Sequence, residues 1–496
     1  MQYRVKVAIV YLLGFFIGLL NMFIVNIAYP DIGATFHAGV SELTWIGTSY
    51  MLGLTVVMPL SVWLAQRFGE KRLIAASLLL FGIASYGAGS AGSIDVLIGI
   101  RFVQGAAAGL LIPVGQAMTY RNYRPAERAR LTSIMMVVAL MAPAVSPSVG
   151  GILVDHISWR WIFWLDIPLA AVNLLLTVLW LQRDPVREPQ RFDVRGFALG
   201  SLSIITLLVG LSELGEPGGR PLGATLLGVA VASGYFFVRA LRNAPAPLLK
   251  LSLLKGKMLA TSMVVYQSVS GIFTGANVIL MLYLQQQLSV SATSTGLLMV
   301  PWAAAAALAI GVTRTAFNRI GPKVLFTVGI FLQSLGLMLL FFLAHPMNPV
   351  LLIVAYVLMG FGGSLSSSTA QSAAFLDTPS AELGQASALW NINRQASFAV
   401  GVAVVGLVLG VFSSMFSSVS DAGAGDPSIA FRWSFVVAAV ITLLPLPLVL
   451  RLTSSSSSAL RGRNGRRWLP GYAPKRRIPS SPHASSTAEK TASACR

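Results

Sequence analysis

The sequence predicts an all-α membrane protein that crosses a bilayer many times. Residues up to about 452 divide into fourteen apolar segments, each close to the ~20 residues that span a ~30 Å hydrocarbon core as a helix. Composition agrees, because 55% of the residues are hydrophobic and 11% are charged, whereas soluble domains carry about 25% charged residues. The predicted spans are 7–29, 43–65, 72–92, 94–119, 131–153, 160–181, 196–214, 221–241, 260–284, 295–316, 323–344, 349–371, 388–412 and 430–452.

Lys and Arg residues alternate between the two sides of these spans. Of the 36 Lys and Arg residues, we assign 31 to one side, three to the other, and two (Arg101 and Arg394) to span interiors. Because cytoplasmic loops retain Lys and Arg, the basic side is predicted to be cytoplasmic, with both termini on it. One loop departs from the pattern: residues 373–386 hold Asp377 and Glu382 but no Lys or Arg. Either this loop is neutral for its own reasons, or a late span is miscounted.

Long basic gaps divide the chain into four parts. We expect residues 1–181 to form a six-helix bundle, 182–257 an inserted two-helix hairpin with flanking cytoplasmic loops, and 258–452 a second six-helix bundle. Residues 453–496 are rich in Ser, Pro, Arg and Lys, which predicts a basic disordered tail. The tail either lies solvated near acidic lipid or binds a regulatory partner.

Composition also narrows the function. The net charge of +19 lies in loops and the tail without interleaved aromatic residues, which indicates attraction to anionic lipid and not nucleic-acid binding. Cys495 is the only cysteine, so no internal disulfide is expected. The four His residues lie apart and no G-x-x-x-x-G-K-[ST] loop occurs, so we expect no metal, no cofactor, no catalytic triad and no direct use of ATP. These features argue against an enzyme, and we expect the protein to be a monomer.

Several short motifs occur in order along the spans. They are Asn21 with Asn26-Ile27-Ala28-Tyr29-Pro30, Gln66-Arg67-Phe68-Gly69-Glu70-Lys71-Arg72, Arg101-Phe102-Val103-Gln104-Gly105, Pro143 with Pro147 and Gly150-Gly151, and Gly384-Gln385-Ala386-Ser387 with Asn391 and Arg394-Gln395. Together they resemble the major facilitator superfamily, specifically its 14-helix drug:proton antiporter branch of multidrug-resistance-type efflux transporters. The resemblance covers residues 7–452 and implies two six-helix halves, plus a two-helix insertion, around a midplane cavity.

The first-span motif departs from the branch at one position. The branch has an aspartate five residues before Asn26, where this chain has Asn21, which cannot titrate but can donate and accept hydrogen bonds. The resemblance places Asn21 and Asn26 on the transport pathway, although for Asn26 a hydrogen bond with a neighbouring helix is favoured over a substrate contact. Asp166 is the acid best placed inside a span, where the family usually has Asn. It is a candidate proton carrier, or it caps its helix or pairs with Arg160.

Further candidates come from the later spans. Arg101 lies several residues inside an apolar span, where an arginine is costly and normally faces a cavity or a partner. It either snorkels to the nearer interface or, with Gln104, serves transport, and in the family this arginine is thought to help proton transfer. Asn391 and Arg394 share one helical face and have either structural or substrate roles. Asn277 is a further candidate cavity contact.

Two motifs predict moving parts. The loop with Gln66, Arg67, Gly69, Lys71 and Arg72 is expected to be a cytoplasmic gating loop; the family has Asp at the first position, where it helps latch the halves, and Gln66 keeps only a hydrogen bond. The loop sets topology, latches the halves, or does both. The exporter-associated motif of the fifth span predicts a hinge or packing face, because small residues allow close approach and proline bends a helix; its residues are Pro143, Pro147, Gly150 and Gly151.

The sequence therefore predicts a secondary transporter that exports small amphipathic compounds by alternating access, with proton antiport as the family's expectation. One alternative is a proton-independent exporter or exchanger of a polar metabolite. Another, of a different class, is a non-transporting membrane sensor or scaffold that uses the basic tail. The expected location is the plasma membrane, as a multi-pass protein (the inner membrane in a bacterium).

Overall fold

The computed structural model describes residues 1–182, 192–214, 219–244, 247–290, 297–343, 348–420 and 428–452, and these residues form helices and connections without a β-strand. The predicted tail, 453–496, lies outside them. The first half of the chain, which we call the N-half, contains α1 (Tyr3–Ile24), the 3-10 turn η1 (Val25–Ala28), α2 (Tyr29–Phe36), α3 (Val40–Phe68), α4 (Glu70–Gly89), α5 (Ile94–Arg121), α6 (Pro125–His156), α7 (Trp161–Trp164) and α8 (Asp166–Trp180).

The remaining helices form an inserted hairpin and a second bundle. The hairpin consists of α9 (Val194–Leu214) and α10 (Arg220–Asn243). The C-half contains η2 (Leu251–Lys255), α11 (Lys257–Tyr266), the π-helical turn η3 (Gln267–Gly271), α12 (Ile272–Leu282), the π-helical turn η4 (Tyr283–Gln287), α14 (Val300–Ile320), α15 (Pro322–Leu339), η5 (Leu340–Phe342), α16 (Pro349–Ala373), η6 (Ser380–Glu382), α17 (Leu383–Ser420), α18 (Ser428–Leu443) and α19 (Leu446–Leu450).

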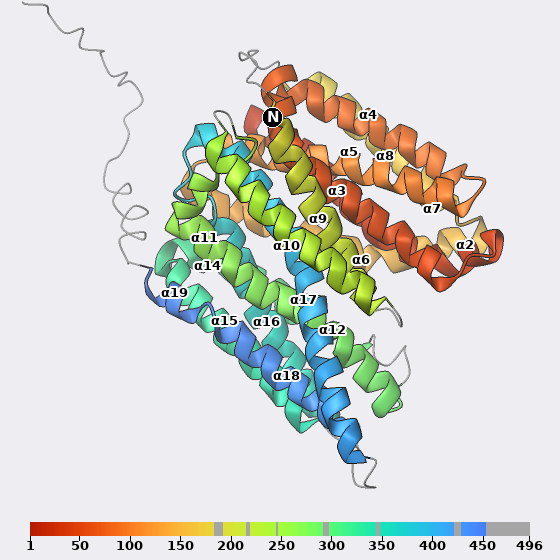
Figure 1. Ribbon diagram of the computed structural model, residues 1–496. Coiled ribbons are helices and arrows are strands. Elements are labelled where there is room, and N and C mark those ends of the chain that lie inside the picture. The colour runs from red at the N-terminus through yellow and green to blue at the C-terminus, as the bar shows by residue number, and fades with distance from the viewer. Residues whose placement is uncertain are drawn as a thin grey trace, which may run out of the picture.

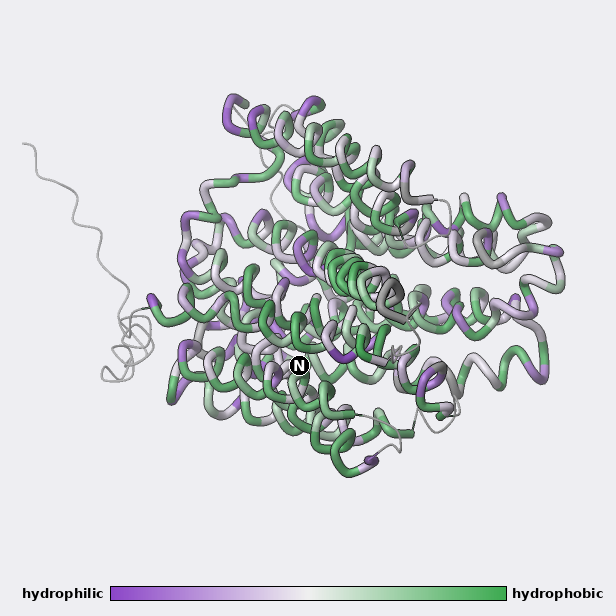
Figure 2. The backbone as a smooth tube through the Cα atoms, turned by 60° about the horizontal axis from the view of Figure 1, so that its bottom comes forward, coloured by the Kyte–Doolittle hydropathy of each residue, from purple (hydrophilic) through white to green (hydrophobic). Residues whose placement is uncertain are grey.

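The helices have the length and composition of membrane spans. Among the described residues, thirteen helical segments are long and apolar enough to cross a bilayer. A further helix, α6, has 32 residues, more than the ~20 that a span needs, so with α6 the number reaches the fourteen that the sequence predicts. Large apolar side chains such as Leu79, Leu179 and Val231 are exposed on the outside, where a lipid-facing surface requires them. Figure 2 shows hydrophobic residues along the helices, with hydrophilic residues mostly at turns and helix ends.

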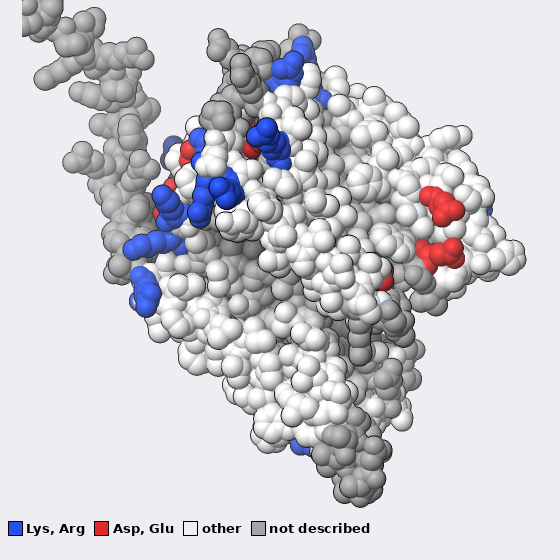
Figure 3. Space-filling view, in the orientation of Figure 1, with Lys and Arg blue, Asp and Glu red and all other residues white. Residues whose placement is uncertain are grey.

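Charge separates the two ends of the bundle. In Figure 3, Lys and Arg gather at the end that holds the N-terminus, and acidic residues face outward at the far end of the N-half. We call the first end, which carries Arg4, Arg67, Arg72 and Arg319, the basic end. The separation is the structural counterpart of the alternating Lys and Arg residues in the sequence.

The two halves meet at the basic end and part at the opposite end (Figure 1). One hydrophobic cluster draws on both halves and includes Tyr11, Tyr120, Phe375 and Trp390. Towards the opposite end the cores are separate: one cluster, with Trp159 and Phe163, belongs to the N-half, and another, with Tyr356 and Phe435, belongs to the C-half. The structure is therefore closed at the basic end and opens away from it.

The hairpin lies across the seam between the halves. Helix α9 packs against both α3 of the N-half and α17 of the C-half, and α10 packs on α9. Both hairpin helices are mostly exposed, as expected of an addition at the lipid-facing side of a complete bundle.

The halves repeat one connection. Between α3 and α4, Gly69 has φ 87°, and between α14 and α15, Gly321 has φ 82°, a backbone conformation that favours glycine. Two residues later, Lys71 Nζ donates to the carbonyls of Val178 and Leu181 at 2.7 and 2.6 Å. Lys323 Nζ donates to the Leu450 carbonyl at 2.6 Å. Each lysine thus stabilises the carboxyl end of the last helix of its own half, where the helix dipole favours a cation.

The acidic loop between α16 and α17 receives its cations from elsewhere. Lys250 Nζ forms an ion pair with Glu382 at 3.0 Å, and Arg128 Nη1 donates to the Phe375 carbonyl at 2.9 Å. Both cations come from segments that the sequence assigns to the basic side. The loop carries no Lys or Arg of its own, and its positive partners lie in the N-half and in the segment that joins α10 to η2, which we call the hairpin connection. No late span therefore needs to be miscounted.

Candidate functional site

A buried polar network lies inside the N-half. Arg101, seven residues into α5, is fully buried. Its Nη1 donates to Asn21 Oδ1 on α1 and to Gln104 Oε1 at 2.9 Å, and its Nε donates to the Ile46 carbonyl of α3 at 3.3 Å. Gln104 Nε2 in turn donates to Ser85 Oγ of α4 at 2.8 Å. The guanidinium therefore has partners on α1, α3 and its own helix α5, with α4 reached through Gln104, and does not snorkel to an interface.

The network continues from Asn21 to an acid. Asn21 Nδ2 donates to Asp166 Oδ2, and both side chains are buried. Arg101 and Asp166 form no direct ion pair, so the neutral amide of Asn21 separates the two charges. Asp166 opens the first turn of α8 but makes no cap hydrogen bond there. Arg160 instead lies over the Trp159 ring, 4.5 Å from its centre, so the alternative pairing of Asp166 with Arg160 is not what the fold adopts.

Close helix contacts enclose this network. A Cβ at Gly105 would overlap the Tyr50 carbonyl oxygen, so only glycine lets α5 approach α3 this closely. The approach puts the Tyr50 ring 4.5 Å from Arg101 Cζ, within cation–π range. Tyr50 Oη also donates to the Gly18 carbonyl of α1 at 2.9 Å, which holds the three helices together. An arginine is tolerated at this depth because its surroundings supply acceptors and a ring face.

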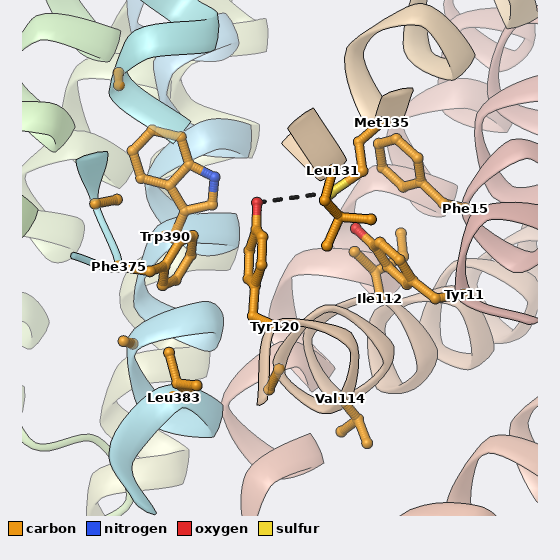
Figure 4. Close-up of a cluster of buried hydrophobic side chains, with 14 of the residues drawn as sticks. Tyr11, Phe15, Ile112, Val114, Tyr120, Leu131, Met135, Phe375, Leu383 and Trp390 are labelled. Carbon is orange, nitrogen blue, oxygen red and sulfur yellow. Dashed lines mark hydrogen bonds between the residues drawn. The ribbon is translucent and has the colours of Figure 1, made fainter. Parts of the chain in front are cut away.

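A second polar group joins the halves near the basic end. Gln116 Oε1 on α5 accepts hydrogen bonds from Ser387 Oγ and Asn391 Nδ2 on α17, both at 2.7 Å. Beside it the Tyr120 and Phe375 rings lie 4.9 Å apart, and Tyr120 Oη points to Met135 of α6 (Figure 4). Asn391 is therefore a contact between the halves, and Gln116, which the motifs did not single out, is its partner.

The remaining candidates of the transport pathway do not join either group. Arg394 is 8% exposed and lies 5.3 Å from the centre of the Phe15 ring on α1. Asn277 is half-buried on α12, and its Oδ1 is buried without a hydrogen-bond partner. Asn26 is exposed at η1. The structure thus brings Asn21, Arg101, Gln104 and Asp166 together, places Asn391 and Arg394 at the seam, and leaves Asn26 and Asn277 apart from them.

A cavity of about 310 Å³ lies at the seam beneath the hairpin. It has mostly apolar walls, to which the side chain of Gln395 adds a polar group. The lining residues come from α3, α9, α12 and α17; they are Thr48, Met51, Thr55, Leu208, Leu211, Thr274, Gln395, Phe398, Ala399, Val402 and Ala403. Sequence reasoning missed these residues, because apolar side chains in a membrane helix carry no signal that separates a cavity wall from a lipid face.

The loop between α3 and α4 acts mainly within its own half. Lys71 binds the end of α8, and Glu70 forms an ion pair with Arg121 of α5. Arg67 lies 5.7 Å from the ring centres of Trp63 and Phe68, and Arg72 is exposed. Gln66 is half-exposed and makes no hydrogen bond within the described part of the chain. Among the described residues, polar contacts that join the two halves here come from Gln116 and Arg128.

The motif of α6 forms a packing face. A Cβ at Gly150 would lie 2.7 Å from Ile27 Cδ1 and 3.0 Å from Ile24 Cγ1, so glycine allows α6 to approach α1 and η1. A Cβ at Gly151 would meet nothing within 4 Å. Pro143 is half-buried in a helix that continues past it, and the side chain of Pro147 is outside the described set.

Comparisons with known proteins agree with this architecture. Residues 11–402 match the sequence profile of the Major Facilitator Superfamily. The chain is 29% identical over 404 residues to the multidrug resistance protein Stp of Mycobacterium tuberculosis, covering 81% of this chain and 75% of that protein. It is 31% identical over 293 residues to the multidrug export protein EmrB of Escherichia coli, covering 58% of this chain and 57% of that protein.

Solved structures show the same fold. The human organic anion transporter MFSD10 superposes with a TM-score of 0.62 at 15% identity, covering 90% of this chain and 100% of that one. The proton:xylose symporter XylE superposes with a TM-score of 0.60 at 14% identity, covering 92% and 99%. The predicted fold is confirmed, and the chain belongs to the major facilitator superfamily, with relatives of the multidrug-resistance kind that its motifs resemble.

Proposed function

We propose that the protein is a proton-coupled exporter of small amphipathic compounds that works by alternating access in the cytoplasmic membrane, the inner membrane of a bacterium. Its multidrug-resistance relatives and its exporter motif support this direction. With the basic end in the cytoplasm, the structure is the outward-facing state. Both termini, and a basic tail near anionic lipid, then lie on the cytoplasmic side.

The observation that carries the proposal is the contact between Asn21 and Asp166. The antiporter branch that this chain resembles has the acid on the first span and usually an amide on the sixth. This chain has the amide on the first span and the acid on the sixth. Because the two side chains touch, the exchange keeps one carboxyl and one amide at the same place in the fold. The missing aspartate of the first span is therefore compensated, and Asp166 is the residue that carries the proton.

The neighbours of Asp166 suit a group that changes charge during transport. A carboxylate in direct contact with an arginine would be held charged, whereas here Asn21 lies between Asp166 and Arg101. Asn21 can donate through Nδ2 to the carboxylate while it accepts from Arg101 through Oδ1. Loss or gain of the proton alters the Asn21 contact and, through it, the position of Arg101 between α1, α3 and α5. This links protonation to helix packing in the N-half.

A transport assay in liposomes tests the proposal. Purified protein is reconstituted with a fluorescent amphipathic dye, and dye movement is measured with and without an imposed pH gradient. We expect the gradient to accelerate transport by the wild type and not by Asp166→Asn. The double variant Asn21→Asp/Asp166→Asn restores the family's arrangement and is expected to recover gradient-driven transport. Asp155→Asn, an exposed acid at the end of α6, is the matched control and is expected to behave as the wild type.

Other outcomes would select the alternatives. Equal dye movement by the wild type with and without the gradient would indicate a proton-independent exporter or exchanger. Gradient-driven transport by Asp166→Asn would place the proton on another group. If no substrate moves and removal of residues 453–496 abolishes the cellular function, the protein is a sensor or scaffold.

A further inference from the structure

Arg394 is a buried cation at the junction of the two halves. It lies about 16 Å along α17 from Leu383, at ~1.5 Å per residue, and so near the middle of a bilayer. Its side chain reaches the N-half, where its Cζ is 5.3 Å from the centre of the Phe15 ring. The residue is 8% exposed; its Nε is shielded from water, whereas its two Nη atoms keep some accessible surface.

The guanidinium of Arg394 has no polar partner. It makes no hydrogen bond or ion pair with any residue that the structure describes, and its Nε is buried and unbonded. Arg101 and Arg128 also each have one buried unbonded nitrogen, Nη2 and Nε respectively. They differ from Arg394 in having polar partners, since Arg101 donates to Asn21 and Gln104 and Arg128 donates to the Phe375 carbonyl. A buried cation without a partner is unfavourable. No residue that the structure describes supplies its counter-charge, which points to a counter-charge brought by a ligand.

Aromatic side chains surround this charge. Trp390 and Phe398 lie one turn before and after Arg394 on α17, and the Tyr266 ring lies edge-on to them at 5.2 and 6.3 Å. Trp390 Nε1 is buried without an acceptor, and Figure 4 shows the indole nitrogen directed toward the side of Tyr120. The indole N–H and the Arg394 guanidinium are both donors, so both suit a ligand that accepts hydrogen bonds.

The charges at the seam favour an anion. Four charged residues are buried among those that the structure describes: Arg101, Arg128, Asp166 and Arg394. The single acid, Asp166, is hydrogen-bonded to Asn21 inside the N-half. A lipophilic cation at the seam would therefore meet Arg394 and Arg128 without a carboxylate to bind it.

We propose that Arg394 binds the negatively charged group of the substrate, and that the preferred substrates are small amphipathic anions such as aromatic carboxylates. This inference rests on the proposed export function and narrows its substrate class. A guanidinium presents a planar fork that matches a carboxylate. The rings of Phe15, Tyr266 and Phe398 cover the apolar body, and Phe398 also lines the cavity that holds Gln395.

Binding of two ligands that differ only in charge tests this directly. The full chain in lipid nanodiscs is titrated with 2-naphthoate and with its neutral amide, 2-naphthamide, and binding to empty nanodiscs is subtracted. We expect the wild type to bind naphthoate about 10-fold more tightly, the scale of one charge-assisted hydrogen bond. Arg394→Gln is expected to remove this preference while naphthamide binding is unchanged, and Arg394→Lys to keep part of it.

A matched control is available on α18. Arg432 also lies over an aromatic ring, 4.9 Å from the centre of Phe341, but its Nε already donates to the Phe341 carbonyl at 2.6 Å. Arg432→Gln is therefore expected to retain the naphthoate preference. Unchanged naphthamide binding by Arg394→Gln also shows that this variant is folded.

Three outcomes would overturn the inference. They are equal affinity of the wild type for the two ligands, tighter binding of the cation 2-naphthylmethylammonium than of naphthoate, and a full naphthoate preference in both Arg394 variants. If Arg394→Gln does not fold, the inference is still tested by the affinities of the wild type for the two ligands and by those of Arg394→Lys. These measurements use no gradient, so their failure leaves proton-driven export standing, and a loss of proton-driven transport leaves the anion preference standing.

Discussion

The N-half and the C-half share a scaffold but differ in what they bury. Both have a positive-φ glycine after their second long helix and a lysine that binds the end of their last helix. The N-half encloses Arg101 and Asp166, whereas the matching region of the C-half holds neutral groups: Gln333 Nε2 donates to the Val269 carbonyl at 2.7 Å, and Thr313 and Ser368 share a hydrogen bond of 2.6 Å.

This difference separates two tasks. The N-half places Arg101 and Asp166 inside one bundle, where they can respond to a proton without contacting substrate. The C-half contributes its one buried charge, Arg394, to the seam among the described residues, where a ligand can reach it. A repeated scaffold can therefore couple ion and substrate if only one copy carries the titratable group.

The largest expected effect comes from the buried Arg101, which is compared with the buried Arg394 at the seam. Arg101→Ala removes the donor to Asn21 and Gln104, and loss of one member of a buried charged network costs about 3–5 kcal/mol. Arg394→Gln removes no polar contact in the described structure, so its cost is expected to be at most about 1 kcal/mol. Thermal unfolding in detergent measures both. Equal destabilisation by the two substitutions would erase the distinction between a structural and a ligand-binding arginine.

Close helix contacts at glycine residues test whether the two halves pack equally tightly. A Cβ at Gly105 would overlap the Tyr50 carbonyl, and one at Gly360 would overlap the Trp302 carbonyl, in the α3–α5 contact and its C-half counterpart. We expect Gly105→Ala and Gly360→Ala each to cost about 1–3 kcal/mol through overpacking. A Cβ at Gly99 or Gly311 meets nothing within 4 Å, so alanine there is expected to be neutral or stabilising by up to about 1 kcal/mol. A tolerant Gly360 would show that the C-half packs less tightly.

The junction of the halves gives an intermediate effect. Gln116→Ala leaves the side chains of Ser387 and Asn391 without their acceptor while the basic end is closed, which costs about 1–3 kcal/mol. Water can bond to both side chains once the basic end opens, so the substitution favours the open state. We expect faster thiol labelling of Ala386→Cys, a buried neighbour, in a Cys495→Ser background. Unchanged labelling would mean that the aromatic contacts alone close this end. Asn122→Ala, which removes a bond only to the Met118 carbonyl of its own helix, is the control.

The smallest effect is expected at the ion pair between the hairpin connection and the C-half. Lys250 and Glu382 are 44% and 30% exposed, and such pairs contribute about 0–1 kcal/mol. Lys250→Ala should change stability by less than 1 kcal/mol, and added salt should cancel the difference. A larger loss would indicate that the hairpin connection helps to hold the C-half closed.

The sequence anticipated features that depend on periodic or rare residues. Apolar length and alternating Lys and Arg predicted the spans and the basic end, and an arginine within an apolar segment predicted a buried partner for Arg101. It could not anticipate that Asn21 and Asp166 touch, because their contact joins residues 145 positions apart in sequence. Gln116 escaped notice because a glutamine in a membrane helix looks the same whether it faces its own bundle or the other half.

For two other residues, the sequence suggested partners that the fold does not use. The pairing of Asp166 with Arg160 was plausible from six residues of separation, but α7 intervenes and Arg160 packs on Trp159. The loop at Gln66 was expected to be able to latch the halves, yet its lysine is used within the N-half. In both cases the sequence identified the segment that holds the polar residue, whereas tertiary packing determined which partner that residue contacts.

The contact between Asn21 and Asp166 also constrains the order in which such an exchange arises in a lineage. Starting from the family's arrangement, losing the first-span acid before gaining the other leaves a protein without a carboxyl at this place. Gaining Asp166 first gives an intermediate with two adjacent carboxyls, which can share one proton because two like charges in contact resist joint ionisation. With Asp166 as the proton carrier, as proposed above, the second order keeps a titratable group at every step, and Asn21 is then expected to be the later of the two substitutions.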